Sequence, residues 1–195
     1  MTRRRGGRCG VGLRCACALV TALVVGATTH HALATTVETV GTTAQAASAD
    51  RIFVGTVTTV LSRPQASAPK FFETVVGFDV EDVVAGSVPA HVDLTFSGGE
   101  VGGILQRVDG MPRFAVGERY VVLLASDQQP RLASPLVGFN QGLYRVVGAS
   151  RASAVVRDRS GQPLPANGAP GTGIAASALS ASEPSLDQFL DTLRA

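Results

Sequence analysis

The sequence predicts a mainly β protein, a small antiparallel barrel of five to six strands with short flanking helices. Three observations support this fold class. Several segments between residues 50 and 164 alternate β-branched or apolar residues at the period of two that strands require. Glycines interrupt several of these segments, as they do where small barrels bend or bulge. No strand pattern alternates with a helix pattern, so an antiparallel sheet is favoured over a parallel α/β fold.

Residues 1–34 are typical of a secretory signal peptide. Five arginines and no acid accompany a short apolar run, Ala16 to Ala27, and small residues follow at Ala32 and Ala34. The alternative is a permanent membrane anchor, but about 12 apolar residues are fewer than the roughly 20 that a spanning helix needs. We therefore expect cleavage after Ala34 and export to a periplasm or to the extracellular space, with no permanent membrane anchor.

Removal of this segment changes the charge and the cysteine content. Five of the 17 lysines and arginines lie before residue 35, which leaves 12 basic residues against 15 acids, a formal charge of −3. We therefore expect no nucleic-acid partner, because phosphate binding needs clustered Lys and Arg. Cys9, Cys15 and Cys17 also precede residue 35, so we expect a mature chain that has no disulfide and depends on its hydrophobic core.

The predicted β-barrel domain covers residues 49–160 and follows an N-terminal helical or extended segment, residues 35–48. Gly55 and Gly77 stand in the middle of long alternating segments, where each predicts a bend or a bulge. The first three strands are predicted at residues 50–62, 71–86 and 92–96.

A long glycine-rich loop is predicted at residues 99–114, with a short helical turn at residues 104–108. Long loops in compact domains are often functional, so this loop is the first candidate for a site. The residues predicted to contact a partner there are Val101, Ile104, Leu105, Arg107, Met111 and Arg113.

The stretch RFAVGERYVVLL, residues 113–124, reads as a turn at Gly117-Glu118 followed by a buried strand, residues 120–124. We interpret Glu118 as a solvated turn acid, because turns favour such residues. The alternative, a catalytic carboxylate, has no partner nearby in the sequence. Two further strands are predicted within residues 135–149, interrupted by Gly138 and Gly142, and within residues 153–164.

The C-terminal part is predicted to form a flexible linker, residues 161–183, and an amphipathic helix, residues 184–195. A helix this short is marginal alone and must dock on something. Its own barrel and a partner protein are both open as the docking surface. The apolar residues at i, i+3, i+4 and i+7 are Leu186, Phe189, Leu190 and Leu193.

Three phrases resemble a known group of proteins: ADRIFVGTV (residues 49–57), FDVEDVVAGSV (78–88) and FAVGERYVVLL (114–124). They are similar to phrases of exported bacterial domains of unknown function, which themselves resemble netrin-like and metalloproteinase-inhibitor (TIMP-like) domains. The resemblance covers roughly residues 49–148 and implies an OB-like barrel. Those inhibitors chelate the protease zinc with an N-terminal cysteine, whereas the predicted new N-terminus here is Thr35. No functional residue is therefore carried over.

The residues of common catalytic sites are scarce. His91 is the only histidine after residue 34, and no G-x-S-x-G elbow accompanies it. Too few ligands are present for a zinc site of His and Cys. Ser67 and Lys70 match the start of a serine acyl-enzyme motif, but its other parts are missing. We expect no catalytic residue, cofactor or metal.

We expect a non-enzymatic exported module that binds another protein, and the resemblance implies a secreted or envelope protease as one class of partner. An oligosaccharide- or nucleotide-binding barrel is the first alternative, and a purely structural role is another. A glycan hydrolase is the third, and it needs two carboxylates that converge in a cleft. The acids available for such a pair are Glu73, Asp79, Glu81, Asp82, Glu100 and Glu118.

Overall fold

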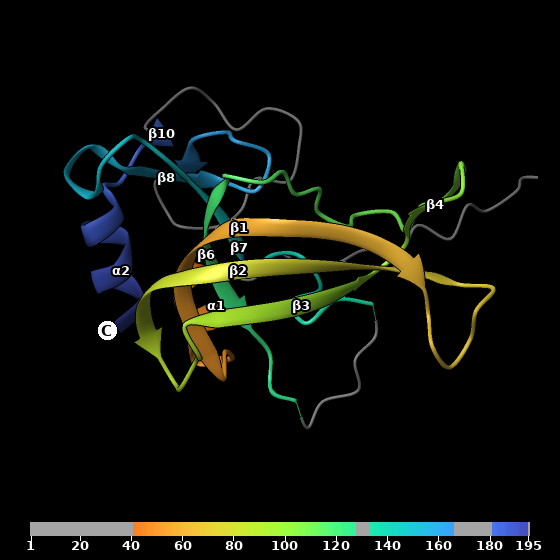
Figure 1. Ribbon diagram of the computed structural model, residues 1–195. Helices are drawn as coiled ribbons and strands as arrows, with labels where there is room; N and C mark the ends of the chain where they lie inside the picture. The colour runs from red at the N-terminus through yellow and green to blue at the C-terminus, as the bar shows by residue number, and fades with distance from the viewer. Residues whose placement is uncertain (1–40, 128–132, 166–180, 195) are drawn as a thin grey trace, which may run out of the picture. The chain divides into compact units, whose positions relative to one another are not determined.

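A six-stranded antiparallel sheet, in the order β3-β2-β1-β6-β7-β8, dominates the computed structural model (Figure 1). The structure describes residues 41–127, 133–165 and 181–194. The predicted signal peptide, its cleavage site and most of the predicted linker lie outside these residues. The strands of the sheet are β1 (Arg51–Pro64), β2 (Phe72–Ala85), β3 (His91–Ser97), β6 (Arg119–Leu124), β7 (Leu143–Val147) and β8 (Val155–Asp158).

The mainly β class is confirmed, and each predicted strand segment contains a strand, but residues 137–142 of the fifth segment form turns and the sheet is not closed into a barrel. Within the described part of the chain, β3 and β8 are the edges of the sheet and no ladder joins them. The outer edge of β8 is instead occupied by the C-terminal part of the chain. Isolated bridges join Val155 to Ser185 and Arg157 to Pro163, and the amide of Val156 donates to the carbonyl of Pro184 at 3.0 Å.

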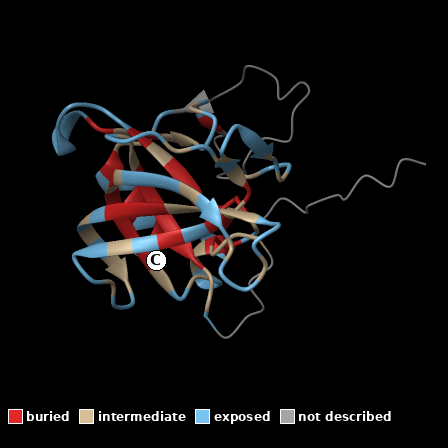
Figure 2. Cartoon of the chain, turned by 45° about the vertical axis from the view of Figure 1, so that its right-hand side comes forward, coloured by how far each residue is buried: buried red, intermediate tan, exposed pale blue. Residues whose placement is uncertain are grey.

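Buried residues gather in the strands of the sheet (Figure 2), and the apolar ones form two cores, one on each face. In β6, Val121 and Leu123 belong to one core, and Tyr120, Val122 and Leu124 belong to the other. All five are at most 2% exposed. This explains why RYVVLL is almost continuously apolar: successive side chains of a strand point to opposite faces, and both faces of β6 are covered.

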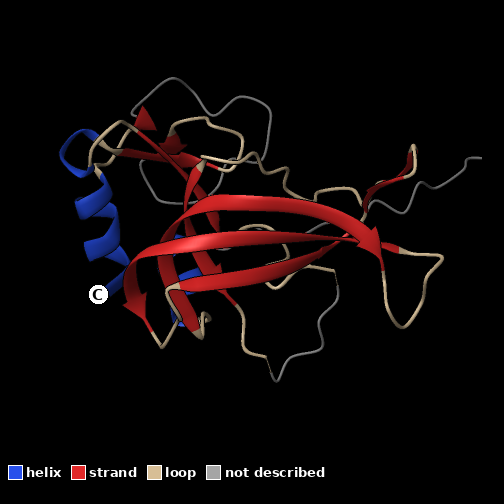
Figure 3. Cartoon of the chain, viewed as in Figure 1, coloured by secondary structure: helices blue, strands red, loops and turns tan. Residues whose placement is uncertain are grey.

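Gly55 and Gly77 mark irregular points of the β1–β2 pair, where their mid-strand positions predict a bend or a bulge. The β1–β2 register shifts beside Gly55 and again between Val57 and Thr59, opposite Gly77. A Cβ atom at Gly55 would lie 2.9 Å from the carbonyl oxygen of Asp79, and one at Gly77 would collide with the hydroxyl of Thr59. Bulges of this kind bend a strand, and β1 is visibly curved (Figure 3).

Two short helices, α1 (Thr42–Ala47) and α2 (Leu186–Arg194), pack on one face of the sheet. All four apolar residues predicted for the C-terminal helix are buried in the same core as Val121 and Tyr144. The aromatic rings of Tyr144 and Phe189 lie 4.8 Å apart between centroids. Of the two docking surfaces left open by the sequence, the C-terminal helix therefore uses its own sheet.

The linker predicted at residues 161–183 is structured at both ends. Strand β9 (Leu164–Pro165) pairs with β10 (Ala181–Ser182) in a separate two-stranded sheet. Its sequence, rich in Pro, Gly, Ala and Ser, did not reveal this pairing, because the two partners are far apart in the chain. No helix in the described residues is long and apolar enough to cross a membrane.

Candidate functional site

The first part of the predicted contact loop is a β-hairpin, made of β4 (Gly99–Val101) and β5 (Ile104–Gln106). The helical turn predicted at residues 104–108 is therefore wrong. Gly102 and Gly103 have φ angles of 58° and 79°, and two central residues with positive φ make the tight turn that fits the twist of paired strands. The Gly-Gly pair between Val101 and Ile104 is the sequence signal that predicts this hairpin.

Gln106 fastens the hairpin to the loop between β1 and β2. Its side-chain oxygen accepts a hydrogen bond from the amide of Phe72, and its nitrogen donates to the carbonyl of Lys70, both at 2.6 Å. The hydroxyl of Thr74 donates to the carbonyl of Gly98 at 2.8 Å, just before the hairpin. The hairpin is thus held to the sheet on two sides.

The segment after the hairpin is anchored in the same manner. The side-chain Nδ2 of Asn140, a residue only 7% exposed, donates to the carbonyl of Gly110. Its neighbour Phe139 has a φ of 70°, a conformation that residues other than glycine rarely adopt and that surrounding contacts must enforce. Phe114 ends the segment by packing its ring edge-on against Phe78 and Tyr120 in the core.

A cavity of about 510 Å³ lies between this anchored segment and the strands β1 and β2. Four of the six predicted contact residues line it: Leu105, Arg107, Met111 and Arg113. Val101 and Ile104 do not line it and lie on the hairpin itself. The lining also includes Val60, Ser62 and Thr74 of β1 and β2, which no local sequence pattern indicates, because the tertiary structure alone brings them to the loop.

Apolar side chains are exposed around the hairpin. Ile104 and Leu105 are 63% and 58% exposed, and Phe71 and Val60 are 50% and 39% exposed. Phe71 lies between the two residues that Gln106 binds, and Val60 lines the cavity beside Leu105. We call these four residues the hairpin surface. The ammonium of Lys70, the only lysine of the chain, lies 5.2 Å from the centroid of the Phe71 ring.

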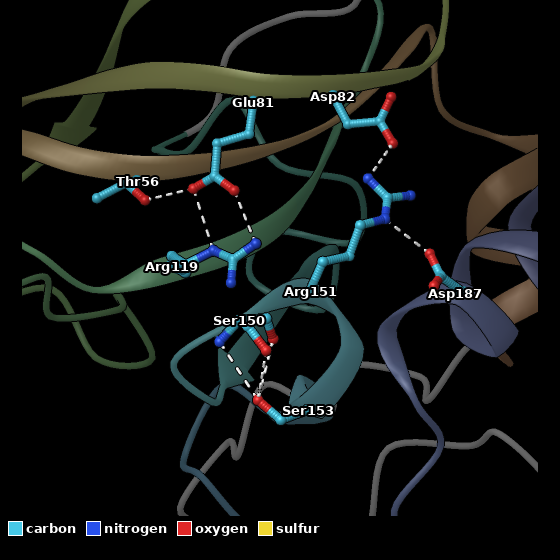
Figure 4. A network of polar contacts seen from close by, with 8 residues as sticks. All are labelled: Thr56, Glu81, Asp82, Arg119, Ser150, Arg151, Ser153 and Asp187. Atoms are coloured by element: carbon cyan, nitrogen blue, oxygen red, sulfur yellow. Dashed lines mark hydrogen bonds and ion pairs between the residues drawn. The ribbon is translucent and has the colours of Figure 1, made fainter.

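Five of the six carboxylates proposed for a glycan hydrolase each pair with a different basic side chain. Glu81 accepts two hydrogen bonds from Arg119, and Asp82 pairs with Arg151, which also binds Asp187 of α2 at 2.8 Å (Figure 4). The remaining pairs are Glu73 with Arg63, Asp79 with His91 and Glu118 with Arg145. This arrangement is typical of structural ion pairs, and none of these contacts joins one proposed acid to another.

His91 lies at the exposed end of β3 between two carboxylates. Its Nδ1 is 2.9 Å from Asp79, and its Nε2 is 3.5 Å from Asp93. The hydrogen bond to Asp79, together with the negative charge of both carboxylates, raises the pKa of His91 above its usual value. Among the described residues no group of three His, Cys, Asp or Glu side chains could hold a metal ion.

Glu118 is a structural residue, and its interpretation as a solvated turn acid is wrong. Its side chain is 20% exposed and accepts hydrogen bonds from the amide of Ala115 at 2.9 Å, the hydroxyl of Tyr120 at 2.7 Å and the guanidinium of Arg145 at 2.5 Å. Burial, and then the bond to Glu118, raise the pKa of Tyr120 well above its usual value. Glu118 thus closes the turn that precedes β6.

No protein-family model, no curated protein and no solved structure matches this chain. The fold and the geometry of the candidate site are therefore the basis for its function.

Proposed function

We propose that this protein is a non-enzymatic exported module that recognises another protein through the hairpin surface. The observation that carries the proposal is the exposure of four apolar side chains, two on a hairpin held in place by Gln106 and two on the neighbouring β1 strand and β1–β2 loop. Exposed apolar residues on a fixed scaffold lose little conformational entropy on binding, which favours association. The hairpin also follows the loop-on-scaffold arrangement common to binding sites.

Export and the OB-like barrel belong to this proposal. The basic and apolar pattern of residues 1–34 supports export. An OB-like arrangement is supported by the order β3-β2-β1-β6-β7, in which β1 joins a three-strand meander to the β6–β7 pair, because an OB barrel is a partly open Greek key of five strands. A protease as the partner rests only on the resemblance to netrin-like and TIMP-like domains.

The alternatives have less support. A barrel that binds oligosaccharides or single-stranded nucleic acid would need aromatic side chains for stacking, and Phe71 is the only aromatic residue among the exposed large apolar side chains of the described chain. The hydrolase would need two carboxylates that converge in a cleft. None of its six proposed acids lines the cavity beside the hairpin, and five of them are held by separate basic side chains.

Affinity capture with matched variants tests the proposal. The full-length gene, with a C-terminal tag, is expressed in its host, and the proteins retained by the tagged chain are identified by mass spectrometry. We expect one saturable partner that is lost with the double variant Ile104→Ser/Leu105→Ser. The control is Val116→Ser, because Val116 is 66% exposed but does not belong to the hairpin surface. Equal capture by the double variant, or no partner for a folded chain, would overturn the proposal.

A further inference from the structure

The cavity beside the hairpin has two chemically distinct parts. Its apolar wall is formed by Val60, Phe96, Leu105, Met111 and Phe114. Two arginines, Arg107 and Arg113, also line it. Its volume of about 510 Å³ falls within the range of sites that bind small molecules, which are largely apolar with a few polar groups that orient the ligand.

The two arginines differ from most arginines of the described chain in having no carboxylate partner there. Seven of the ten described arginines form ion pairs with acids. The exceptions are Arg107, Arg113 and Arg159, and two of these three line the same cavity. Asp109 also lines the cavity, but it lies beyond ion-pair distance of both arginines.

The cavity walls are held by contacts from distant parts of the chain. Gln106 and Gly110 are fixed by hydrogen bonds to the β1–β2 loop and to Asn140, and Phe114 is fixed in the core. Arg107 and Arg113 therefore project from an anchored segment. Binding of a ligand to these arginines would therefore require little further ordering of the backbone, as expected of a preformed site.

We propose that this cavity binds a small amphipathic carboxylate, whose apolar body packs on Phe96, Met111 and Phe114 while its carboxylate pairs with Arg107 and Arg113. Guanidinium groups suit this role because their planar donors match a carboxylate, often with two parallel hydrogen bonds. This ligand site goes beyond the proposed protein contact and does not depend on it.

Met111 provides a local reporter for the test. The chain has only two methionines, Met1 and Met111, and Met1 lies in the predicted signal peptide. The full chain, labelled at the methionine methyl groups, is titrated by NMR with decanoate below its micellar concentration, and in parallel with the uncharged analogue 1-decanol. We expect a saturable shift of the Met111 methyl resonance with decanoate and at least tenfold weaker binding of decanol.

Two variants separate charge recognition from apolar binding. Arg107→Gln/Arg113→Gln is expected to weaken decanoate binding at least tenfold, and the control Arg159→Gln to leave it unchanged. All three arginines are exposed, so folding should persist, and circular dichroism checks it. The absence of a saturable shift, equal binding of decanol, or full binding by the double variant would overturn the ligand site. Decanoate binding without a captured partner would overturn only the protein contact.

Discussion

The hydroxyl of Tyr120 donates a hydrogen bond to the carboxylate of Glu118 at 2.7 Å, across the turn that leads into β6. The same carboxylate binds Arg145 of β7, so a single acid joins the turn to two neighbouring strands. Removing the Glu118 carboxylate would leave the buried Tyr120 hydroxyl and the Arg145 guanidinium without this partner. The free-energy cost of an unsatisfied buried polar group exceeds the net contribution of its hydrogen bond.

We therefore expect Glu118→Ala to lower the free energy of unfolding by about 1–3 kcal/mol. Glu118→Gln retains an acceptor but loses the charge, so its effect should be smaller. Urea unfolding measures both. The matched control is Glu100→Ala, an exposed acid of β4 whose removal should change stability by less than about 0.5 kcal/mol. Equal effects at the two positions would show that Glu118 is not structural.

Alkaline titration should show that neither tyrosine ionises in the folded protein near its usual pKa. The chain has two tyrosines, Tyr120 and Tyr144, and no tryptophan, so its tyrosinate absorption reports these residues alone. Burial is the main cause that raises the pKa of each. Because the folded pKa exceeds the unfolded value of about 10, their contribution to stability is complete below pH 10 and is lost as the pH rises further.

The measurement compares tyrosinate absorption in buffer and in urea. The unfolded chain should titrate at about pH 10, whereas the folded chain should show tyrosinate only at higher pH, together with the loss of its circular dichroism. A native chain that titrates like the unfolded one, with its secondary structure intact, would contradict the burial of both rings.

Docking of α2 is expected to contribute strongly to stability. Leu190 is fully buried between the helix and the sheet. Leu190→Ala leaves a cavity and should lower the free energy of unfolding by about 2–5 kcal/mol, as seen in urea. Asp191→Ala, one residue later but 76% exposed at its side chain, should change it by less than about 0.5 kcal/mol. A small effect of Leu190→Ala would mean that α2 detaches readily.

Gln106→Ala should release the hairpin without unfolding the sheet. The variant removes the acceptor of the Phe72 amide, so hydrogen exchange of this amide should become faster. Exchange at the Val121 and Val122 amides, in the middle of the sheet, serves as the control and should not change. Unchanged exchange at Phe72 would show that Gln106 does not hold the hairpin.

The pKa of His91 should lie above 6.5, and Asp79 should be the main cause. NMR titration of the imidazole measures it, and Asp79→Asn should lower the pKa more than Asp93→Asn does. Because the folded pKa is raised, the stabilisation exists below pH 6.5 and disappears as the pH rises through the folded value. The reverse order of the two variants would contradict the observed geometry.

The features that the sequence determined by itself are those set by neighbouring residues. Alternation, or for β6 a continuous apolar run, located the strands of the sheet, and Gly55 and Gly77 indicated the bulges. The spacing from Leu186 to Leu193 predicted the C-terminal helix. The Gly102-Gly103 turn also had a local signal, and the helix predicted beside it was an error of interpretation. The alternation of strands, the residues of turns and the apolar face of a helix can be read from short segments. Each depends only on local backbone geometry and on the residues of the segment itself.

Contacts between distant residues could not be read from the sequence. Gln106 binds Lys70 across 36 positions, and Arg151 binds Asp82 across 69. The same holds for the open sheet, whose last edge is covered by the C-terminal segment, and for the cavity, whose walls come from β1, β2 and the loop. Such contacts depend on which strands become neighbours and in which register, and these choices are made by the packing of the whole chain.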